Sequence, residues 1–124
     1  MKELRDLTKA EDQLMRVLWR LKKGLIKDIA DQMPEPKPAY NTIATVLKVL
    51  KTKGFVDHEN VGNMYVYFPL VEEKEYTRFA FNKLFSNYFS GSYQRLVSFL
   101  VEEKGMDSET RKELLKLANK LKED

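Results

Sequence analysis

The sequence predicts a mainly helical protein with one small β-hairpin. Apolar residues recur at helical spacing through most of the chain. One short run near the middle is rich in aromatic and β-branched residues and follows a turn with asparagine and glycine, as strands of a hairpin do. Hydrophobic residues make up 43% of the 124 residues, which is enough for a packed core. We therefore expect a folded chain rather than a disordered one.

Two helices are predicted before Pro34. Thr8–Glu11 matches a capping box, in which a hydroxyl and a carboxylate three residues apart bond free backbone amides. The helix that follows has one apolar face and is expected to end at Gly24. Trp19 falls off this face, so we expect it to pack at the edge of the core. A second, short helix is expected over residues 25–33, because the prolines that follow exclude helix.

A third helix is expected to begin at Ala39 or Tyr40 and to stop at Gly54. One of its faces is apolar, and the opposite face is polar; the apolar positions are Ile43, Val46, Leu47 and Leu50. Two strands are then expected, over residues 55–59 and 64–69, joined by a turn. The first 70 residues are thus predicted to form three helices and a hairpin.

Residues 71–124 are predicted to form three more helices, interrupted at Gly91 and Gly105, with Asp107 as the N-cap of the last one. About 50 residues in short helices, rich in Phe and Tyr, cannot bury their apolar surface alone. We therefore expect a domain over residues 1–70 and a helical dimerisation domain over residues 71–124. The candidate dimer contacts are Tyr76, Phe79, Phe85, Tyr88, Phe89, Leu96, Phe99, Leu100, Leu114, Leu117 and Leu121.

Three helices followed by a hairpin are the elements of a winged helix-turn-helix, which places its third helix in the major groove of DNA. No acidic residue occurs between Pro36 and Val56, whereas four lysines do, namely Lys37, Lys48, Lys51 and Lys53. A local basic surface of this kind attracts phosphate. The candidate DNA-binding residues are Lys37, Ala39, Tyr40, Asn41, Thr42, Thr45, Lys48, Lys51, Asn63 and Tyr65. A winged-helix module that binds a protein and no DNA remains the alternative.

Catalysis and metal binding are not predicted. The chain has no cysteine and one histidine, and it has no glycine-rich phosphate loop or histidine–carboxylate metal motif. Disulfides and thiolate metal sites are excluded. We therefore predict no catalytic residue, no metal and no cofactor. The charged N-terminus and the lack of a long apolar stretch predict a cytoplasmic location, and the net charge of +3 is a weak sign of an anionic partner.

The chain resembles the penicillinase and methicillin-resistance repressors, the BlaI/MecI/CopY group, over nearly its whole length. The resemblance is carried by Leu7–Glu11 with Met15–Trp19, by Asn41–Leu47 with Leu50 and Lys53-Gly54, by Tyr65–Pro69 and by Tyr88–Ser92. It implies an N-terminal winged helix with a C-terminal helical dimerisation domain. It also implies a homodimer that binds a pseudo-palindromic, double-stranded operator and represses nearby genes.

For the β-lactam-responsive members, the resemblance implies a membrane sensor with a metalloprotease domain, which triggers cleavage of the repressor. The pair Ser98-Phe99 stands where those members have Asn-Phe, and it is the candidate cleavage site. Tyr40-Asn41-Thr42 stands where well-known members have Pro-Lys-Thr, and Asn63 replaces a wing arginine. Thr42 is thus the best candidate for a base contact, while the amide of Asn41 suits adenine and predicts a different operator. The copper-responsive branch uses a cysteine-rich site, which this chain lacks.

Overall fold

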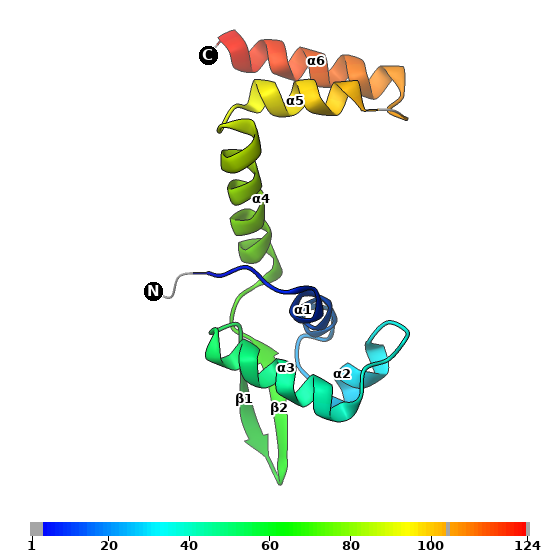
Figure 1. Ribbon diagram of the computed structural model, residues 1–124, viewed down its shortest axis with the longest axis vertical. Helices are drawn as coiled ribbons and strands as arrows, with labels where there is room; N and C mark the ends of the chain where they lie inside the picture. Colours follow the sequence, from blue (N-terminus) through cyan, green and yellow to red (C-terminus); the bar gives the residue numbers. More distant parts are fainter. Residues whose placement is uncertain (1–3, 104, 124) are drawn as a thin grey trace. The chain divides into compact units, whose positions relative to one another are not determined.

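The computed structural model describes residues 4–103 and 105–123, without the side chains of residues 118 and 121–123. Its described part confirms the predicted order of three helices, a hairpin and three helices (Figure 1). The elements are α1 (Lys9–Leu21), α2 (Ile26–Gln32), α3 (Tyr40–Thr52), β1 (Val56–Val61), β2 (Met64–Pro69), α4 (Glu73–Phe89), α5 (Tyr93–Glu102) and α6 (Ser108–Glu123). The chain forms two compact units, Met1–Arg78 and Phe79–Asp124, which divide within α4.

The start of α1 and the course of the chain after it depend on backbone hydrogen bonds. The capping box is confirmed, because Thr8 Oγ1 accepts from the amide of Glu11 at 3.2 Å and Glu11 Oε1 accepts from the amide of Thr8 at 2.9 Å. After the helix, the amide of Gly24 donates to the carbonyl of Tyr67 at 2.9 Å, and the amide of Tyr67 donates back at 2.8 Å. This exchange satisfies both backbone groups and ties the loop after α1 to the hairpin.

The hairpin is a regular antiparallel pair. Its register runs from Val56 opposite Pro69 to Val61 opposite Met64, which leaves a two-residue turn at its tip. Gly62, the first turn residue, has a φ of 64°, a backbone conformation that favours glycine. The second turn residue, Asn63, therefore lies at the tip of this hairpin, which is called the wing below.

The core of the N-terminal unit lies between α1, α2, α3 and the start of the hairpin. The predicted apolar faces meet there; the fully buried side chains include Leu14, Leu18, Ile29, Ile43, Leu47, Leu50 and Phe55. The edge position predicted for Trp19 is wrong, because its side chain is 8% exposed and belongs to this core. Trp19 Nε1 donates to the carbonyl of Val71 at 2.8 Å, so the chain that leaves β2 covers this side of α1.

Tyr76, on the first turn of α4, closes the same core. Its ring lies 6.2 Å from that of Trp19 and 5.7 Å from that of Phe55, measured between ring centroids. Its hydroxyl accepts from the amide of Leu7 at 3.0 Å. The beginning of α4 therefore packs with the N-terminal unit, which extends beyond the residue-70 boundary expected from the sequence.

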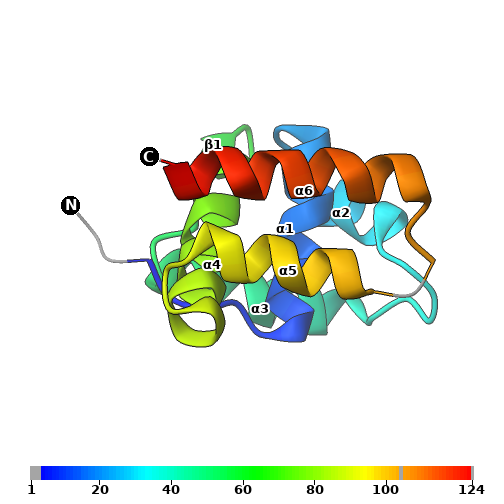
Figure 2. The ribbon, with the colours of Figure 1, turned by 90° about the horizontal axis from the view of Figure 1, so that it is seen from above.

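In the C-terminal unit, α5 and α6 lie side by side and run in opposite directions (Figure 2). The predicted N-cap of α6 is confirmed, because Asp107 Oδ1 accepts from the amide of Thr110 at 2.7 Å. That backbone hydrogen bond holds the pKa of Asp107 below its usual value. Arg111 Nε donates to the carbonyl of Val101 at 2.9 Å and so joins the two helices.

Candidate nucleic-acid interface

The outer face of α3 is polar and opposite its buried face. Ile43 and Leu50 are buried in the core, whereas Asn41, Thr45 and Lys48 are exposed. The three exposed residues are spaced by four and three positions, so they lie along one side of the helix. An amide, a hydroxyl and an ammonium group therefore form one stripe on a helix that the core holds firmly.

Tyr40 and Thr42 lie on different flanks of α3. Exposed Tyr40 lines a depression of about 300 Å³, together with residues 25–27 at the start of α2 and residues 63–65 at the tip of the hairpin. Thr42 lines a depression of about 280 Å³ on the other flank, which is bounded by α1 and the proline-containing loop. The first turn of α3 thus faces the wing with its tyrosine and the α1 side with its threonine. Asn63 and Tyr65, predicted as wing contacts, line the first depression together with Tyr40.

A cluster of rings orders the exposed surface of the wing. The register places His58 directly opposite Tyr67. The His58 ring stacks on Tyr65 with a centroid distance of 4.2 Å, and it lies 5.3 Å from the ring of Tyr67. Burial raises the pKa of the Tyr67 hydroxyl, whereas Tyr65 stays exposed. The stack therefore supports an exposed aromatic ring beside Tyr40 of α3.

Lys51 connects α3 to the wing. Its Nζ lies 3.6 Å from Asp57 Oδ1 and 3.4 Å from His58 Nδ1, both on β1. The pKa of Asp57 is below its usual value, first because its carboxylate accepts from the amide of His58 and then because of the charge on Lys51. The ammonium group of Lys51 therefore already interacts with two side chains of the wing. For Lys48, in contrast, no carboxylate partner is found among the residues that the structure describes.

The other two lysines of the acid-free segment have partners of different kinds. Lys53 Nζ lies 2.7 Å from Glu11 Oε1, and the two side chains are only 17% and 7% exposed. Burial raises the pKa of Glu11, but hydrogen bonds from Lys53 and from the amide of Thr8 outweigh it and leave this pKa below its usual value. The charge of Lys53 is thus used within the fold, where it pairs with Glu11. Lys37 Nζ donates to the carbonyl of Asp31 at 2.6 Å, and its side chain stays exposed.

Sequence reasoning predicts Asn63 and Tyr65 but misses other residues of this surface. His58 belongs to the wing cluster because strand alternation puts it on the face of Tyr65 and Tyr67, which follows once the turn is known to have two residues. Lys27 gives no signal in the sequence, because its place beside Tyr40 results from the packing of α2 near the hairpin. Ala39, also predicted, is exposed as the N-cap residue of α3.

Two other classes of site do not occur in residues 4–103 and 105–123. Among the side chains that the structure describes in these ranges, no three His, Asp or Glu are grouped so that they would hold a metal ion. No described helix has both the length and the apolar character needed to cross a bilayer.

The order of the elements and the exposed third helix define the N-terminal unit as a winged helix. It is similar to the solution structure of the DNA binding domain of the repressor BlaI, with a TM-score of 0.53 and 27% sequence identity, over 61% of this chain and 94% of that one. The family model described as penicillinase repressor matches residues 7–120. The chain therefore belongs to the penicillinase repressor family, as its sequence predicts.

Two relatives are similar along nearly their whole length. The methicillin resistance regulatory protein MecI of Staphylococcus aureus (strain N315) is 25% identical over 116 residues, which are 93% of this chain and 94% of that protein. The penicillinase repressor of Bacillus licheniformis is 23% identical over 118 residues, which are 94% of this chain and 92% of that protein. Members of this family are transcriptional repressors and not enzymes.

Proposed function

We propose that this chain is a homodimeric transcriptional repressor that binds a pseudo-palindromic operator through α3 and the wing. The observation that carries the proposal is the common depression lined by Tyr40 on α3 and by Asn63 and Tyr65 on the wing. A winged helix needs its third helix and its hairpin on one side of the molecule, because the helix enters the major groove while the wing follows the adjacent backbone. Membership in a repressor family supports the same assignment.

The proposed roles follow from exposure and chemistry. Asn41 and Thr42, on the first turn of α3, contact base edges, since the N-terminal end of a recognition helix reaches deepest into the groove. Lys48 and Lys37 contact phosphate, because both are exposed and neither ammonium is paired with a carboxylate among the described residues. The DNA backbone beside these bases is contacted by the remaining predicted residues other than Thr45, namely Ala39, Tyr40, Lys51, Asn63 and Tyr65.

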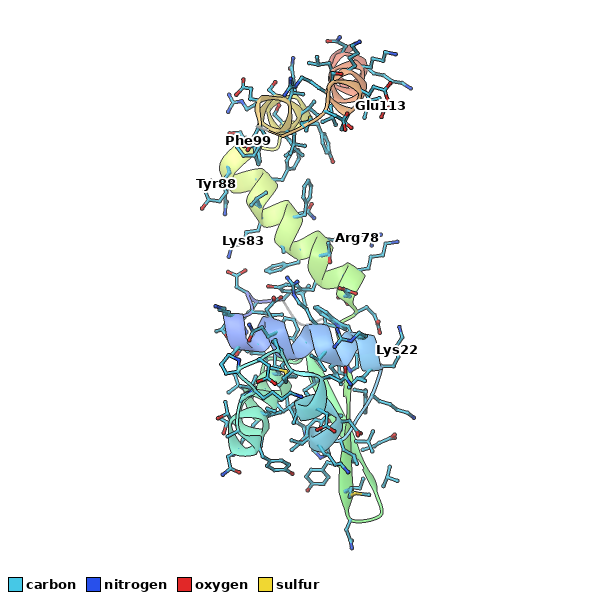
Figure 3. The ribbon with its side chains drawn as sticks, turned by 90° about the vertical axis from the view of Figure 1, so that its right-hand side faces the viewer. Lys22, Arg78, Lys83, Tyr88, Phe99 and Glu113 are labelled. Atoms are coloured by element: carbon cyan, nitrogen blue, oxygen red, sulfur yellow. The ribbon has the colours of Figure 1, made fainter. Side chains whose placement is uncertain are left out.

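Dimerisation is assigned to the C-terminal unit because this unit exposes large apolar side chains. Tyr88 is 77% exposed and Phe99 is 49% exposed, and Figure 3 shows the Tyr88 side chain pointing away from α4. Several large exposed apolar side chains in one small unit are typical of an interface. Among the predicted contacts, Leu117 is exposed as well, and the half-buried ones are Phe79, Phe85, Phe89, Leu96, Leu100 and Leu114.

Two of the predicted dimer contacts do not contribute to this argument. Tyr76 packs with the N-terminal core, and the side chain of Leu121 lies outside the described residues. The proposal therefore depends on the residues from Phe79 to Leu117.

Cleavage of the repressor, which would release it from the operator and would involve a membrane sensor-protease as partner, remains a prediction from the family resemblance. The candidate bond Ser98-Phe99 lies inside α5, and both side chains are exposed. A backbone bond in a helix becomes accessible to a protease when the helix opens locally. We therefore expect cleavage at this bond to require partial unfolding of α5.

The proposal is tested with the purified full-length chain and promoter fragments from its own genome. Binding is measured by fluorescence anisotropy at increasing salt concentrations, and the mass of the free protein is measured by light scattering. A repressor prefers particular fragments and loses affinity steeply with salt, because phosphate neutralisation releases counterions. The alternative, a protein-interaction module, predicts no sequence preference at any salt concentration. A monomer at micromolar concentration would contradict the two-fold operator.

A further inference from the structure

Two threonines on α3 use their hydroxyl groups as hydrogen-bond donors within the helix. Thr45 Oγ1 donates to the carbonyl of Asn41 at 2.9 Å, and Thr52 Oγ1 donates to the carbonyl of Lys48 at 3.1 Å. A hydroxyl has a single proton, so neither side chain donates to a base while this bond is kept. Exposed Thr45 therefore offers DNA an acceptor oxygen and a methyl group.

Val49 also presents methyl groups on the surface of α3, next to that of Thr45. It is 41% exposed in the third turn of α3, where Leu47 and Leu50 fill the core positions. Thr45 and Val49 are four residues apart, so their side chains are neighbours on the helix surface. Thr45 and Val49 stay exposed, whereas Leu47 and Leu50 of the same helix are buried in the core, so the surface of Thr45 and Val49 is open to a ligand.

We propose that Thr45 and Val49 recognise thymine, by contact of their methyl groups with the C5-methyl groups of thymines in the major groove. Thymine is the base that presents a methyl group there, and an apolar contact distinguishes it from the other bases. The inference rests on the proposed DNA-binding function and specifies its ligand as a half-site with thymines under the middle of α3. The neighbouring amide of Asn41 suits adenine, which agrees with such a half-site.

The first experiment compares thymine with deoxyuridine, which lacks only the C5-methyl group. The full-length chain selects its preferred duplex from a random library, and that duplex is then synthesised with deoxyuridine at one thymine position at a time. We expect the affinity to fall about fourfold at one or two positions in each half-site, the factor that corresponds to loss of one buried methyl-sized group. Thymines outside these positions should tolerate the change.

Paired variants assign the effect to particular side-chain groups. Thr45→Val keeps a methyl group and removes the hydroxyl, whereas Thr45→Ser keeps the hydroxyl and removes the methyl. The thymine-to-deoxyuridine affinity ratio should persist in Thr45→Val and approach one, at a single position, in Thr45→Ser. Val49→Ala should lose the ratio at another position, and Val49→Thr should keep it. A general defect in folding lowers both affinities alike and leaves the ratio unchanged.

Several results would overturn the inference. Loss of the ratio in Thr45→Val together with its retention in Thr45→Ser would mean that the hydroxyl is the recognised group. Equal affinity for thymine and deoxyuridine at every position would exclude methyl recognition while leaving sequence-specific DNA binding intact. Failure to select any duplex would instead remove the proposed function, and the inference with it.

Discussion

The two compact units differ in how completely each one buries its own apolar side chains. The N-terminal unit encloses a core of large residues, among them Phe55 and Leu14, whose side chains are almost inaccessible to solvent. In the C-terminal unit, Val97 is the one described apolar residue that is buried, and it is still 7% exposed. The N-terminal unit therefore has the core that an independent domain needs, whereas the C-terminal unit leaves apolar surface for a partner to cover.

The rings of the C-terminal unit illustrate this difference. Phe85 lies 5.4 Å from Phe81 and 4.6 Å from Tyr93, and Phe89 lies 5.5 Å from Phe99, measured between centroids. These rings contact one another, yet Phe81, Tyr93 and Phe99 remain exposed. The arrangement agrees with the proposed dimer, in which a second copy excludes water from these rings.

The largest effect is expected from a charge in the C-terminal unit. Phe99→Asp should convert the dimer to a monomer, because an unpaired charge buried at an interface is costly. Operator affinity should fall by about 100-fold or more, since two half-sites are no longer bound by one linked molecule. Light scattering and operator titration measure the two effects. Phe99→Leu, which keeps an apolar side chain, is the control and should stay dimeric; unchanged dimerisation of Phe99→Asp would place Phe99 outside the interface.

A change in the core of the N-terminal unit should lower the stability of the fold and leave dimerisation intact. Lys53→Met leaves the carboxylate of Glu11 without its cation and should lower the free energy of unfolding by about 2 kcal/mol, because the pair is largely shielded from water. Urea unfolding of the full chain measures this loss, and dimerisation of the folded protein should persist. Lys51→Met removes a lysine from an exposed pair and should leave the free energy of unfolding nearly unchanged. Equal losses in the two variants would contradict a structural role for Lys53.

The same ion pair predicts a pH dependence. Because the pKa of Glu11 in the folded chain is below its usual value, the ionised carboxylate stabilises the fold. This stabilisation is fully present above the ordinary pKa of a glutamate, and it is lost as the pH falls from there through the lowered pKa of the folded state. Glu11→Gln should flatten this part of the stability curve, measured by urea unfolding at successive pH values. A variant curve as steep as that of the unchanged chain would exclude Glu11 as its source.

A smaller loss, confined to DNA binding, is expected at the start of α3. Thr42→Ala should weaken binding to the preferred duplex by about 1–3 kcal/mol, the range for a direct base contact. Binding to unrelated DNA, dimerisation and stability should hardly change. Thr77→Ala, which removes an exposed hydroxyl from α4, is the matched control. Equal weakening for all duplexes would mean that Thr42 contacts the backbone rather than a base.

The smallest effects are expected from single lysines on α3. Lys48→Ala should weaken binding to all duplexes alike and reduce the salt slope by about one for each phosphate that the protein no longer neutralises. Lys51→Ala should act in the same way but less, because Asp57 and His58 already share its ammonium group. Titrations at several salt concentrations measure both. A weakening confined to one sequence would contradict the phosphate role.

Local patterns predict the elements and their ends well. The capping box at Thr8, the cap at Asp107 and the apolar face of α3 depend on residues at most a few positions apart, and all three are confirmed. The expectation for Trp19 is wrong because helical spacing indicates which side of a helix is apolar, but not which later segment covers it. The carbonyl that bonds Trp19 belongs to Val71, 52 residues further along the chain.

The sequence by itself determined the order of the helices and the hairpin, the buried face of α3 and the family to which the chain belongs. The tertiary structure decided which charges are available to a ligand and which aromatic residues belong to which core. Lys53 is paired with Glu11, 42 residues away in the sequence, and is therefore not available to a ligand. The hydroxyl of Tyr76 accepts from the amide of Leu7, 69 residues away in the sequence. Caps and amphipathic faces arise between neighbours in the chain, whereas the partner of a long side chain is the group that folding places within its reach.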